Sequence, residues 1–168
     1  KAANPETILN YIETKKREYL HILPQLKVMQ TKEEDEGVEY YKTFRGIKSL
    51  ISKMFENSNP KNSYRYFSPS AKCYQKAKRA YMGGKHLRIL KKIKTRAIFH
   101  ESLRGLVKPS RTSIKRFISL QFPNITLYNN QVAIVSWDDE PSGVLIKSKD
   151  LYESYSKLFE EMWKVGKK

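Results

Sequence analysis

The sequence is poor in the residues from which most metal and redox sites are built. Its 168 residues include one cysteine, Cys73, and three histidines, His21, His86 and His100, which lie far apart in the chain. A single cysteine cannot form an internal disulfide, and this set offers no metal-ligand spacing. We therefore expect no metal, no cofactor and a reducing, cytoplasmic location.

Long apolar runs are also missing. No segment reaches the roughly 18–20 apolar residues of a membrane span, and Lys1–Asn10 lacks the apolar core of a signal peptide. A membrane partner is therefore not expected. The chain begins with Lys1 rather than Met, which indicates a fragment or a processed product. At 39% hydrophobic and 30% charged residues, it has the composition and the length of about one globular domain.

The common catalytic motifs are absent. The sequence contains no G-x-G-x-x-G, G-x-x-x-x-G-K-[ST], H-E-x-x-H or G-x-S-x-G pattern. The pair Gly83-Gly84 is more typical of a helix end than of a phosphate loop. Cys73 lies in the basic stretch Lys72–Lys78, which favours the thiolate, but no histidine and asparagine are placed near it in the sequence. These absences predict that the chain is not an enzyme and has no catalytic residues.

Acidic residues are scarce in the middle of the chain. Between Lys72 and Arg116 there are fifteen lysines and arginines and one acid, Glu101, which accounts for most of the net charge of +16. Such a block attracts phosphate groups and other anions. The basic block is explained equally well by a surface that only contacts solvent and by a surface that binds DNA or an anion. Both interpretations stay open. The predicted basic surface comprises Lys72, Lys76, Lys78, Arg79, Lys85, Arg88, Lys91 and Lys92.

The first 30 residues predict a long helix. Asn4 and Pro5 form a helix start, and an apolar seam then advances by four and three residues, as in a coiled coil. The seam consists of Ile8, Ile12, Lys15, Tyr19 and Ile22. Pro24 predicts a kink or an end near Ile22–Leu23. The seam suits a dimer contact or packing on a parent domain. The acidic stretch 30–37 predicts a boundary.

From residue 38 onwards the pattern alternates between strands and helices. Expected strands cover residues 38–42, 63–68, 95–99, 113–119, 125–128, 131–137 and 144–147, and expected helices cover 44–57, 71–81, 85–92 and the segment after an Asp150 cap. Asn129-Asn130 is a hairpin turn that tolerates positive φ. This order predicts an α/β fold with a mixed sheet flanked by helices. We therefore expect a linker helix over 1–30 and one domain over 38–168.

Several hydrophobic patterns, marked by a few Trp, Gly and Pro residues, occur in the order found in the TrmB family of archaeal-type transcriptional regulators, which the chain thus resembles. The segment Asn124–Trp163 resembles the closing hairpin, strand and "L-F-x-x-x-W" helix of that family. The stretch Ala3–Glu6 with the following helix resembles its linker helix, and Tyr40-Tyr41 with Arg45-Gly46-Ile47 resembles its first strand–helix unit. The resemblance extends over roughly residues 1–165.

The resemblance implies a fold, partners and a role. Family members carry an N-terminal winged helix-turn-helix that binds promoter DNA, then a coiled-coil helix and a domain similar to the phospholipase D fold. This chain would begin at the linker helix and lack the DNA-binding half. The expected function is a regulatory, effector-sensing, homodimeric domain without catalysis. The effector is unidentified, and the basic block is compatible with an anion. Some members bind sugars through a further C-terminal domain, which this chain would lack.

The phospholipase D comparison can be tested on individual residues. That chemistry uses H-x-K-x-x-x-x-D, with histidine as the nucleophile and lysine as the phosphate ligand. Aligning Asn129 with the aspartate places Phe122 at the histidine and Asn124 at the lysine, and no histidine follows His100. An inactive hydrolase is therefore expected. The alternatives are a phosphodiesterase or nuclease of this type, and sequence-independent nucleic-acid binding through residues 72–116.

Polar residues near the expected strand ends are the candidates for effector binding. The resemblance implies a phospholipase D-like fold, whose pocket lies at the strand ends and would bind the ligand. The candidates are Ser68, His100, Glu101, Asn124, Asn129 and Ser136.

Overall fold

The computed structural model describes residues 5–30, 36–59, 61–82, 86–108 and 110–168. The chain divides into two compact units, Lys1–Asp35 and Glu36–Lys168. The first unit contains one long helix, and the second contains every described strand. The predicted Asn4 cap, the Gly83-Gly84 helix end and Lys85 of the basic surface lie outside the described residues.

Helix α1 spans Pro5–Gln30 and contains Pro24 in its interior. The helix therefore does not end near Ile22–Leu23, which was one of the two outcomes that the sequence predicted. Proline removes one backbone hydrogen bond but has a φ angle that suits a helix, so the surrounding turns can continue past it. The seam residues of α1 are exposed, with Ile8 and Ile12 both 55% accessible.

The second unit is built on a seven-stranded sheet in the order β1-β7-β6-β5-β2-β3-β4. Strands β2, β3 and β4 are parallel to one another, and all other neighbours are antiparallel. The strands are β1 (Gly37–Lys42), β2 (Tyr64–Phe67), β3 (Thr95–His100), β4 (Ser113–Ile118), β5 (Asn124–Tyr128), β6 (Gln131–Ser136) and β7 (Ser142–Lys147). The predicted α/β class with a mixed sheet is confirmed.

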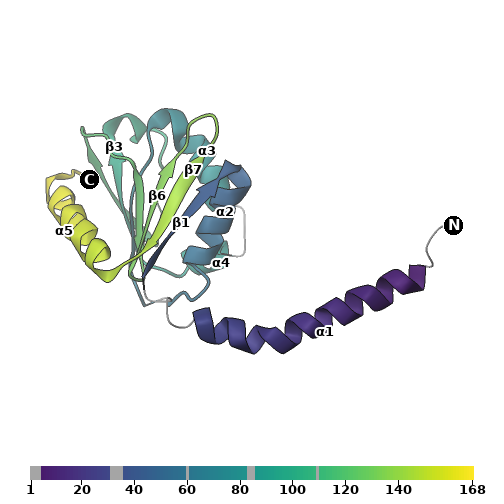
Figure 1. Ribbon diagram of the computed structural model, residues 1–168. Coiled ribbons are helices and arrows are strands. Elements are labelled where there is room, and N and C mark those ends of the chain that lie inside the picture. Colours follow the sequence, from purple (N-terminus) through teal and green to yellow (C-terminus); the bar gives the residue numbers. More distant parts are fainter. Residues whose placement is uncertain (1–4, 31–35, 60, 83–85, 109) are drawn as a thin grey trace. The chain divides into compact units, whose positions relative to one another are not determined.

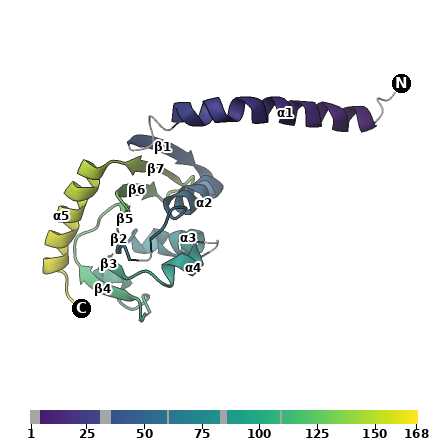
Figure 2. The ribbon, with the colours of Figure 1, turned by 90° about the horizontal axis from the view of Figure 1, so that it is seen from below.

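Helices cover both faces of this sheet (Figures 1 and 2). One face carries α2 (Thr43–Met54), α3 (Ala71–Tyr81) and α4 (Leu87–Leu90), and the other carries α5 (Lys149–Val165). A short 3-10 turn, Glu101–Leu103, follows β3. The result is a three-layer arrangement in which side chains alternate between the two faces along each strand.

The apolar stripe of α2 forms the core on its face of the sheet. Ile47, Leu50, Ile51 and Met54 recur every three or four residues, and all four are buried, in one cluster with Leu145 of β7. Each fully buried side chain of this size contributes about 1.5–3 kcal/mol relative to exposure. This packing fixes α2 against the antiparallel half of the sheet.

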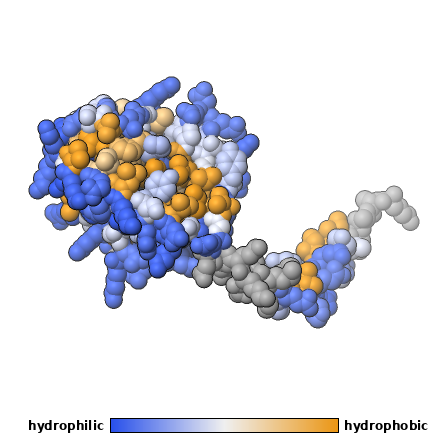
Figure 3. Space-filling view, turned by 60° about the vertical axis from the view of Figure 1, so that its left-hand side comes forward, coloured by the Kyte–Doolittle hydropathy of each residue, from blue (hydrophilic) through white to orange (hydrophobic). Residues whose placement is uncertain are grey.

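Helix α5 packs on the opposite face mainly through Phe159. Phe159 is fully buried in a cluster with Phe67 of β2 and Ile98 of β3. Only part of the apolar face of this helix belongs to the core, because Leu151 and Leu158 are 42% and 37% exposed. Figure 3, in which the side of Figure 1 that carries α5 has come forward, shows apolar atoms gathered in the middle of this side.

Local turn chemistry agrees with the sequence at the hairpin but differs at α5. Asn129 and Asn130 have φ angles of 50° and 58°, so the predicted turn is confirmed. The predicted Asp150 cap is wrong. Ser148 has the extended backbone of a cap, and its hydroxyl accepts a hydrogen bond from the amide of Leu151 (3.4 Å). Asp150 instead lies inside the first turn, where its charge complements the helix dipole.

Candidate functional site

Five of the six predicted ligand residues lie at one edge of the sheet. Strands β2 and β3 are parallel and β5 is antiparallel to both β2 and β6. The ends of β2, β3 and β6 therefore meet the start of β5 at the same edge. The residues at this edge are Ser68, His100, Glu101, Asn124 and Ser136. Asn129 lies at the other end of β5, where its side chain accepts a hydrogen bond from Asn62 (2.9 Å).

Asn124 is buried at the centre of this edge. Its amide nitrogen donates to the carbonyl of Phe67 (2.8 Å), and its amide oxygen accepts from the indole nitrogen of Trp137 (2.9 Å). Only 4% of the residue is exposed. Because a buried amide must be satisfied, these two bonds tie the end of β2 to the residue that follows β6. Asn124 thereby holds the edge together.

A small hollow of 140 Å³ opens beside Asn124. Pro69, Cys73, Phe122 and Trp137 are among the residues that line it. Ser68 is buried nearby, and its hydroxyl donates to the carbonyl of Pro69 (3.1 Å). Ser136 is exposed and donates to the carboxylate of Asp138 (2.5 Å). The hollow is large enough for a few water molecules, and small for an organic effector.

His100 and Glu101 follow the neighbouring strand β3. The Nε2 atom of His100 lies 3.1 Å from the carbonyl of Ser119, and Nδ1 lies 2.8 Å from the hydroxyl of Ser102. A carbonyl can only accept, so this contact assigns the proton to Nε2 and leaves Nδ1 as an acceptor. Glu101 forms an ion pair with Arg104 (2.9 Å), whose hydrogen bond holds the pKa of that carboxyl below its ordinary value.

The residues aligned with the phospholipase D motif have structural contacts. Phe122 stacks on Phe67 with 4.7 Å between ring centroids, and Asn124 makes the two hydrogen bonds given above. Neither side chain supplies a nucleophile or a cation. At the same edge, His100 is the one described histidine. The edge therefore carries an imidazole on β3 and an amide on β5.

The described part of the chain has neither a cluster of metal ligands nor a membrane-spanning helix. Within it, no group of three or more His, Cys, Asp and Glu side chains is placed to hold a metal ion. No helix there is both long and apolar enough to cross a bilayer. Cys73 is half-buried, and its thiol donates a weak hydrogen bond to the carbonyl of Trp137 (3.7 Å).

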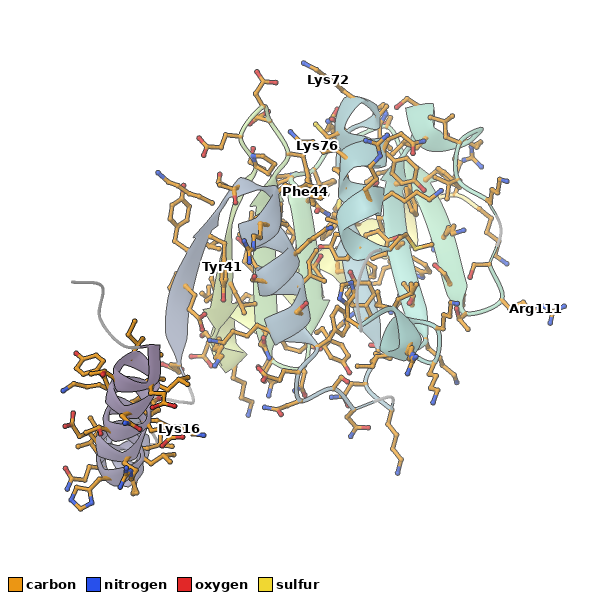
Figure 4. All side chains as sticks on the ribbon, turned by 90° about the vertical axis from the view of Figure 1, so that its right-hand side faces the viewer. Lys16, Tyr41, Phe44, Lys72, Lys76 and Arg111 are labelled. Carbon is orange, nitrogen blue, oxygen red and sulfur yellow. The ribbon has the colours of Figure 1, made fainter. Side chains whose placement is uncertain are left out.

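The predicted basic surface lies on α3, α4 and the residues that follow α4. Lys72, Lys78, Arg79, Arg88, Lys91 and Lys92 are exposed. None of these six forms a salt bridge with any other residue that the structure describes. Lys76 differs, since its ammonium donates to the carbonyls of Asp138 and Asp139. Figure 4 shows Lys72 and Lys76 on α3, with Lys72 projecting away from the ribbon. This surface therefore offers several cations without internal anionic partners.

Sequence reasoning missed a larger cavity on the same side of the sheet. It has a volume of 360 Å³ and lies between α3–α4 and strands β2, β3 and β4. Its lining includes the aromatic side chains Tyr64, Tyr66, Tyr74, Tyr81 and Phe99. The alternation of Tyr64 and Tyr66 on β2 was visible in the sequence, but it indicated only a strand. The cavity forms from several elements that are separated along the chain.

Solved structures with a similar fold include a DNA-binding protein and two nucleases. TrmBL2, an archaeal chromatin protein with a novel mode of DNA binding, is 14% identical, with a TM-score of 0.57; the match covers 96% of this chain and 66% of TrmBL2. Nuc, a phospholipase D family member from Salmonella typhimurium, is 14% identical, with coverages of 79% and 97% and a TM-score of 0.52. NucT from Helicobacter pylori is 11% identical, with coverages of 77% and 98% and a TM-score of 0.55. No family model and no curated protein matches the sequence.

These structures contradict the prediction that the chain is not an enzyme. Nuc and NucT are phospholipase D-family nucleases, which are enzymes. The prediction rested on missing motifs, among them the H-x-K pattern, for which the hairpin strand has Phe122 and Asn124 in place of histidine and lysine. A missing motif excludes one set of residues, whereas a fold hosts several chemistries. The mixed sheet with helices on both faces, together with these matches, shows that the chain has a phospholipase D-like α/β fold.

Proposed function

We propose that this chain is the regulatory and dimer-forming part of a TrmB-like transcription regulator that acts on DNA. One observation carries the proposal. The likeness to TrmBL2 covers 96% of the chain, so it includes most of α1 as well as the sheet, whereas the likeness to the two nucleases covers 79% and 77%. A long helix joined to a phospholipase D-like unit is thus what this chain has in common with a DNA-binding protein.

The surface of α1 supports a role in dimerisation. Ile8 and Ile12 are 55% exposed, Tyr19 is 53% exposed and Ile22 is 46% exposed. These residues advance by four and three positions, so they follow one side of the helix, as in a two-stranded coiled coil. Lys15, the polar member of the seam, pairs with Glu18 of the same helix (2.7 Å). A second copy of the helix would bury the apolar members, each with a gain of about 1–2 kcal/mol.

The same helix offers a route for regulation. In the full regulator, α1 would connect the sheet-containing unit to DNA-binding domains on its N-terminal side. An effector that binds the sheet-containing unit would then change the geometry of the dimer and so the spacing of those domains. This requires the effector to bind two dimer geometries with different affinities.

Light scattering tests the dimer. We expect the wild-type chain to have twice the chain mass of 19.8 kDa. The double variant Ile12→Asp, Tyr19→Asp should be monomeric because it places four carboxylates in the seam of each dimer. The matched control is Asn10→Asp, Thr14→Asp, which adds the same charge to exposed positions outside the seam and should stay dimeric. A monomeric wild type, or equal dissociation of both variants, would contradict the proposal.

Direct contact with the DNA backbone is the second proposed function, and the basic surface favours it. Its exposed cations lack internal partners among the described residues, so they are available to phosphate. Binding of this kind depends steeply on salt and weakly on sequence. A titration of unrelated duplexes at several salt concentrations tests it: equal affinities with a steep slope are expected, and a flat slope would exclude it.

Phosphodiester hydrolysis is tested separately, because the fold is also that of nucleases. Release of p-nitrophenol from bis(p-nitrophenyl) phosphate measures it directly. His100 is the described histidine at the strand-end edge, so turnover that depends on the protein should fall in His100→Ala if this edge is catalytic. Turnover that is unchanged in His100→Ala would assign hydrolysis to other residues or to a contaminant.

A further inference from the structure

The cavity between α3–α4 and the parallel strands has an aromatic wall. Tyr66 and Phe99 meet edge to face with centroids 5.8 Å apart, and Tyr74 meets Phe99 in the same way at 6.2 Å. Tyr64 adds a further ring 5.4 Å from that of Tyr66. Rings arranged in this way present both edges and faces to the space between them. Such a wall suits a flat, apolar group.

The described residues that line this cavity include four lysines and no aspartate or glutamate. The lysines come from different elements: Lys78 from α3, Lys91 from the segment after α4, and Lys108 and Lys115 from the loop before β4 and from β4 itself. Burial holds the pKa of Lys115 below its ordinary value, although its ammonium contacts the carbonyl of Lys108. An anion beside Lys115 would offset the cost of burying this charge.

One residue of the cavity lining, Ser113, has a polar side chain without a partner among the described residues. The hydroxyl of Ser113 is buried and has no hydrogen-bond partner in the described structure. Ser113 and Lys115 are two residues apart on β4, so their side chains lie on the same face of the sheet. An unsatisfied buried hydroxyl destabilises the protein, and a ligand that accepts its hydrogen bond would remove that cost.

From these observations we infer that the cavity is a binding site for a small anion with an aromatic body, the ring lying among Tyr66, Tyr74 and Phe99 and the anionic group bonded to Lys115 and Ser113. The volume of 360 Å³ is within the range of small-molecule sites. A carboxylate and a phosphate satisfy the same donors. The role of this ligand as the effector rests on the proposed regulatory function, whereas its binding does not.

Calorimetric titration of the whole chain with intact and divided probes tests the inference. Indole-3-acetate and phenyl phosphate each combine a ring with an anion, whereas indole and acetate are the halves of the first probe, and phenol and inorganic phosphate are the halves of the second. We expect at least one intact probe to bind about tenfold or more tightly than either of its halves, since ring and anion are bound together. Preference for one intact probe assigns a carboxylate or a phosphate ligand. If neither intact probe binds more tightly than its halves, the inference is overturned.

Variants of β4 locate the site. Lys115→Met should weaken the binding of the intact probe about tenfold. The control Lys94→Met removes a charge at an exposed position outside the cavity lining, and it should change the affinity by less than about twofold. Ser113→Ala should weaken binding several-fold without lowering the unfolding midpoint, because it removes an unpartnered hydroxyl. Equal losses in Lys115→Met and Lys94→Met would show charge attraction alone and overturn the site. Light scattering of the dimer is independent of these titrations, so each proposal fails separately.

Discussion

The two faces of the parallel half of the sheet use their cations in opposite ways. On the α5 face, Arg65, Arg96 and Arg116 all make contacts inside the protein. On the α3–α4 face, the exposed lysines and arginines of the basic surface have no carboxylate partners among the described residues. Because Arg96 and Arg116 belong to the block Lys72–Arg116, that block contains two groups of cations with different roles.

The contacts of the arginines fasten α5 to the sheet. Arg96 donates two hydrogen bonds to the carboxylate of Glu160 (2.7 and 2.8 Å), and its guanidinium lies 4.3 Å from the ring centroid of Trp163. Arg65 donates to the hydroxyls of Tyr152 and Ser156, each at 2.9 Å. Arg116 donates to the backbone carbonyl of Trp163 and also lies over its ring (4.9 Å). Planar guanidinium groups suit such combined bonding and stacking.

The difference shows why a count of charges does not identify a binding surface. Strand alternation turns Arg96 and Arg116 towards α5, where they are half-buried and bonded. The helical positions of Lys72, Lys78 and Arg79 on α3 instead leave their side chains exposed. The cations available to a ligand are therefore those without an internal partner, which the structure distinguishes and the composition does not.

The largest expected effect comes from removing Arg96. Arg96→Met keeps much of the side chain's apolar stem but removes two bonds to Glu160 and the stacking on Trp163, which should lower the free energy of unfolding by about 2–3 kcal/mol. Urea unfolding measures this loss. Lys94→Met, two residues earlier and exposed, is the control and should change little. A loss below about 0.5 kcal/mol for Arg96→Met would remove the structural role assigned to the α5 face.

A smaller loss is expected when Glu160 keeps its shape but loses its charge. Glu160→Gln should cost about 1–2 kcal/mol, because the carboxylate is 41% exposed and solvent weakens its ion pairs. Urea unfolding at neutral pH checks this value. An unchanged unfolding midpoint would mean that the charge of Glu160 does not contribute to stability through its ion pairs with Arg65 and Arg96.

The effect of Glu160→Gln should also depend on pH. Hydrogen bonds from Arg96 hold the pKa of Glu160 below the ordinary value of 4.5. The stabilisation by this carboxylate is therefore complete above pH 4.5 and is lost as the pH falls through the lowered pKa of the folded state. Unfolding curves of wild type and variant should converge below pH 4.5. Curves that stay equally far apart in this acidic range would contradict the assigned ion pairs.

The smallest effect is expected on the other face. Lys91→Ala, Lys92→Ala removes two exposed charges without salt bridges in the described structure, so the free energy of unfolding should change by less than about 0.5 kcal/mol. Thermal and urea unfolding both report it. A clear loss of stability would show that these lysines are also part of the scaffold and would erase the contrast between the faces.

Most of the fold followed from local patterns. The strands and helices of the second unit occur where alternation and three-to-four spacing predicted them, and Asn129-Asn130 forms the expected turn. The cap of α5 was predicted wrongly because two local signals competed there. Ser148 and Asp150 are both capping residues, and only the backbone of Ser148 has the extended conformation that a cap needs. Pro24 by itself favours a helix end, yet α1 continues past it to Gln30.

The candidate sites were less predictable than the fold. Strand ends indicated Ser68, His100 and Asn124 at one edge, but not that both polar groups of Asn124 are bonded to Phe67 and Trp137. The aromatic cavity was missed altogether, because Tyr66, Tyr74 and Lys115 belong to three separate elements. Contacts between distant segments decide these features, and no local pattern encodes them. Absence of a motif was also poor evidence against an enzyme fold.

The salt dependence of DNA binding tests most directly the claim that the exposed cations of the α3–α4 face meet phosphate while the arginines hold α5. The test variant changes Lys72, Arg79, Arg88 and Lys92 to alanine. The control variant removes the same charge from exposed positions elsewhere, by changing Lys61, Lys149, Lys157 and Lys164 to alanine. We expect the slope of log K against log salt to fall by about 0.9 for each phosphate that the test variant no longer binds, and to change little in the control. Equal slopes in wild type and test variant, or equal changes in both variants, would contradict the claim.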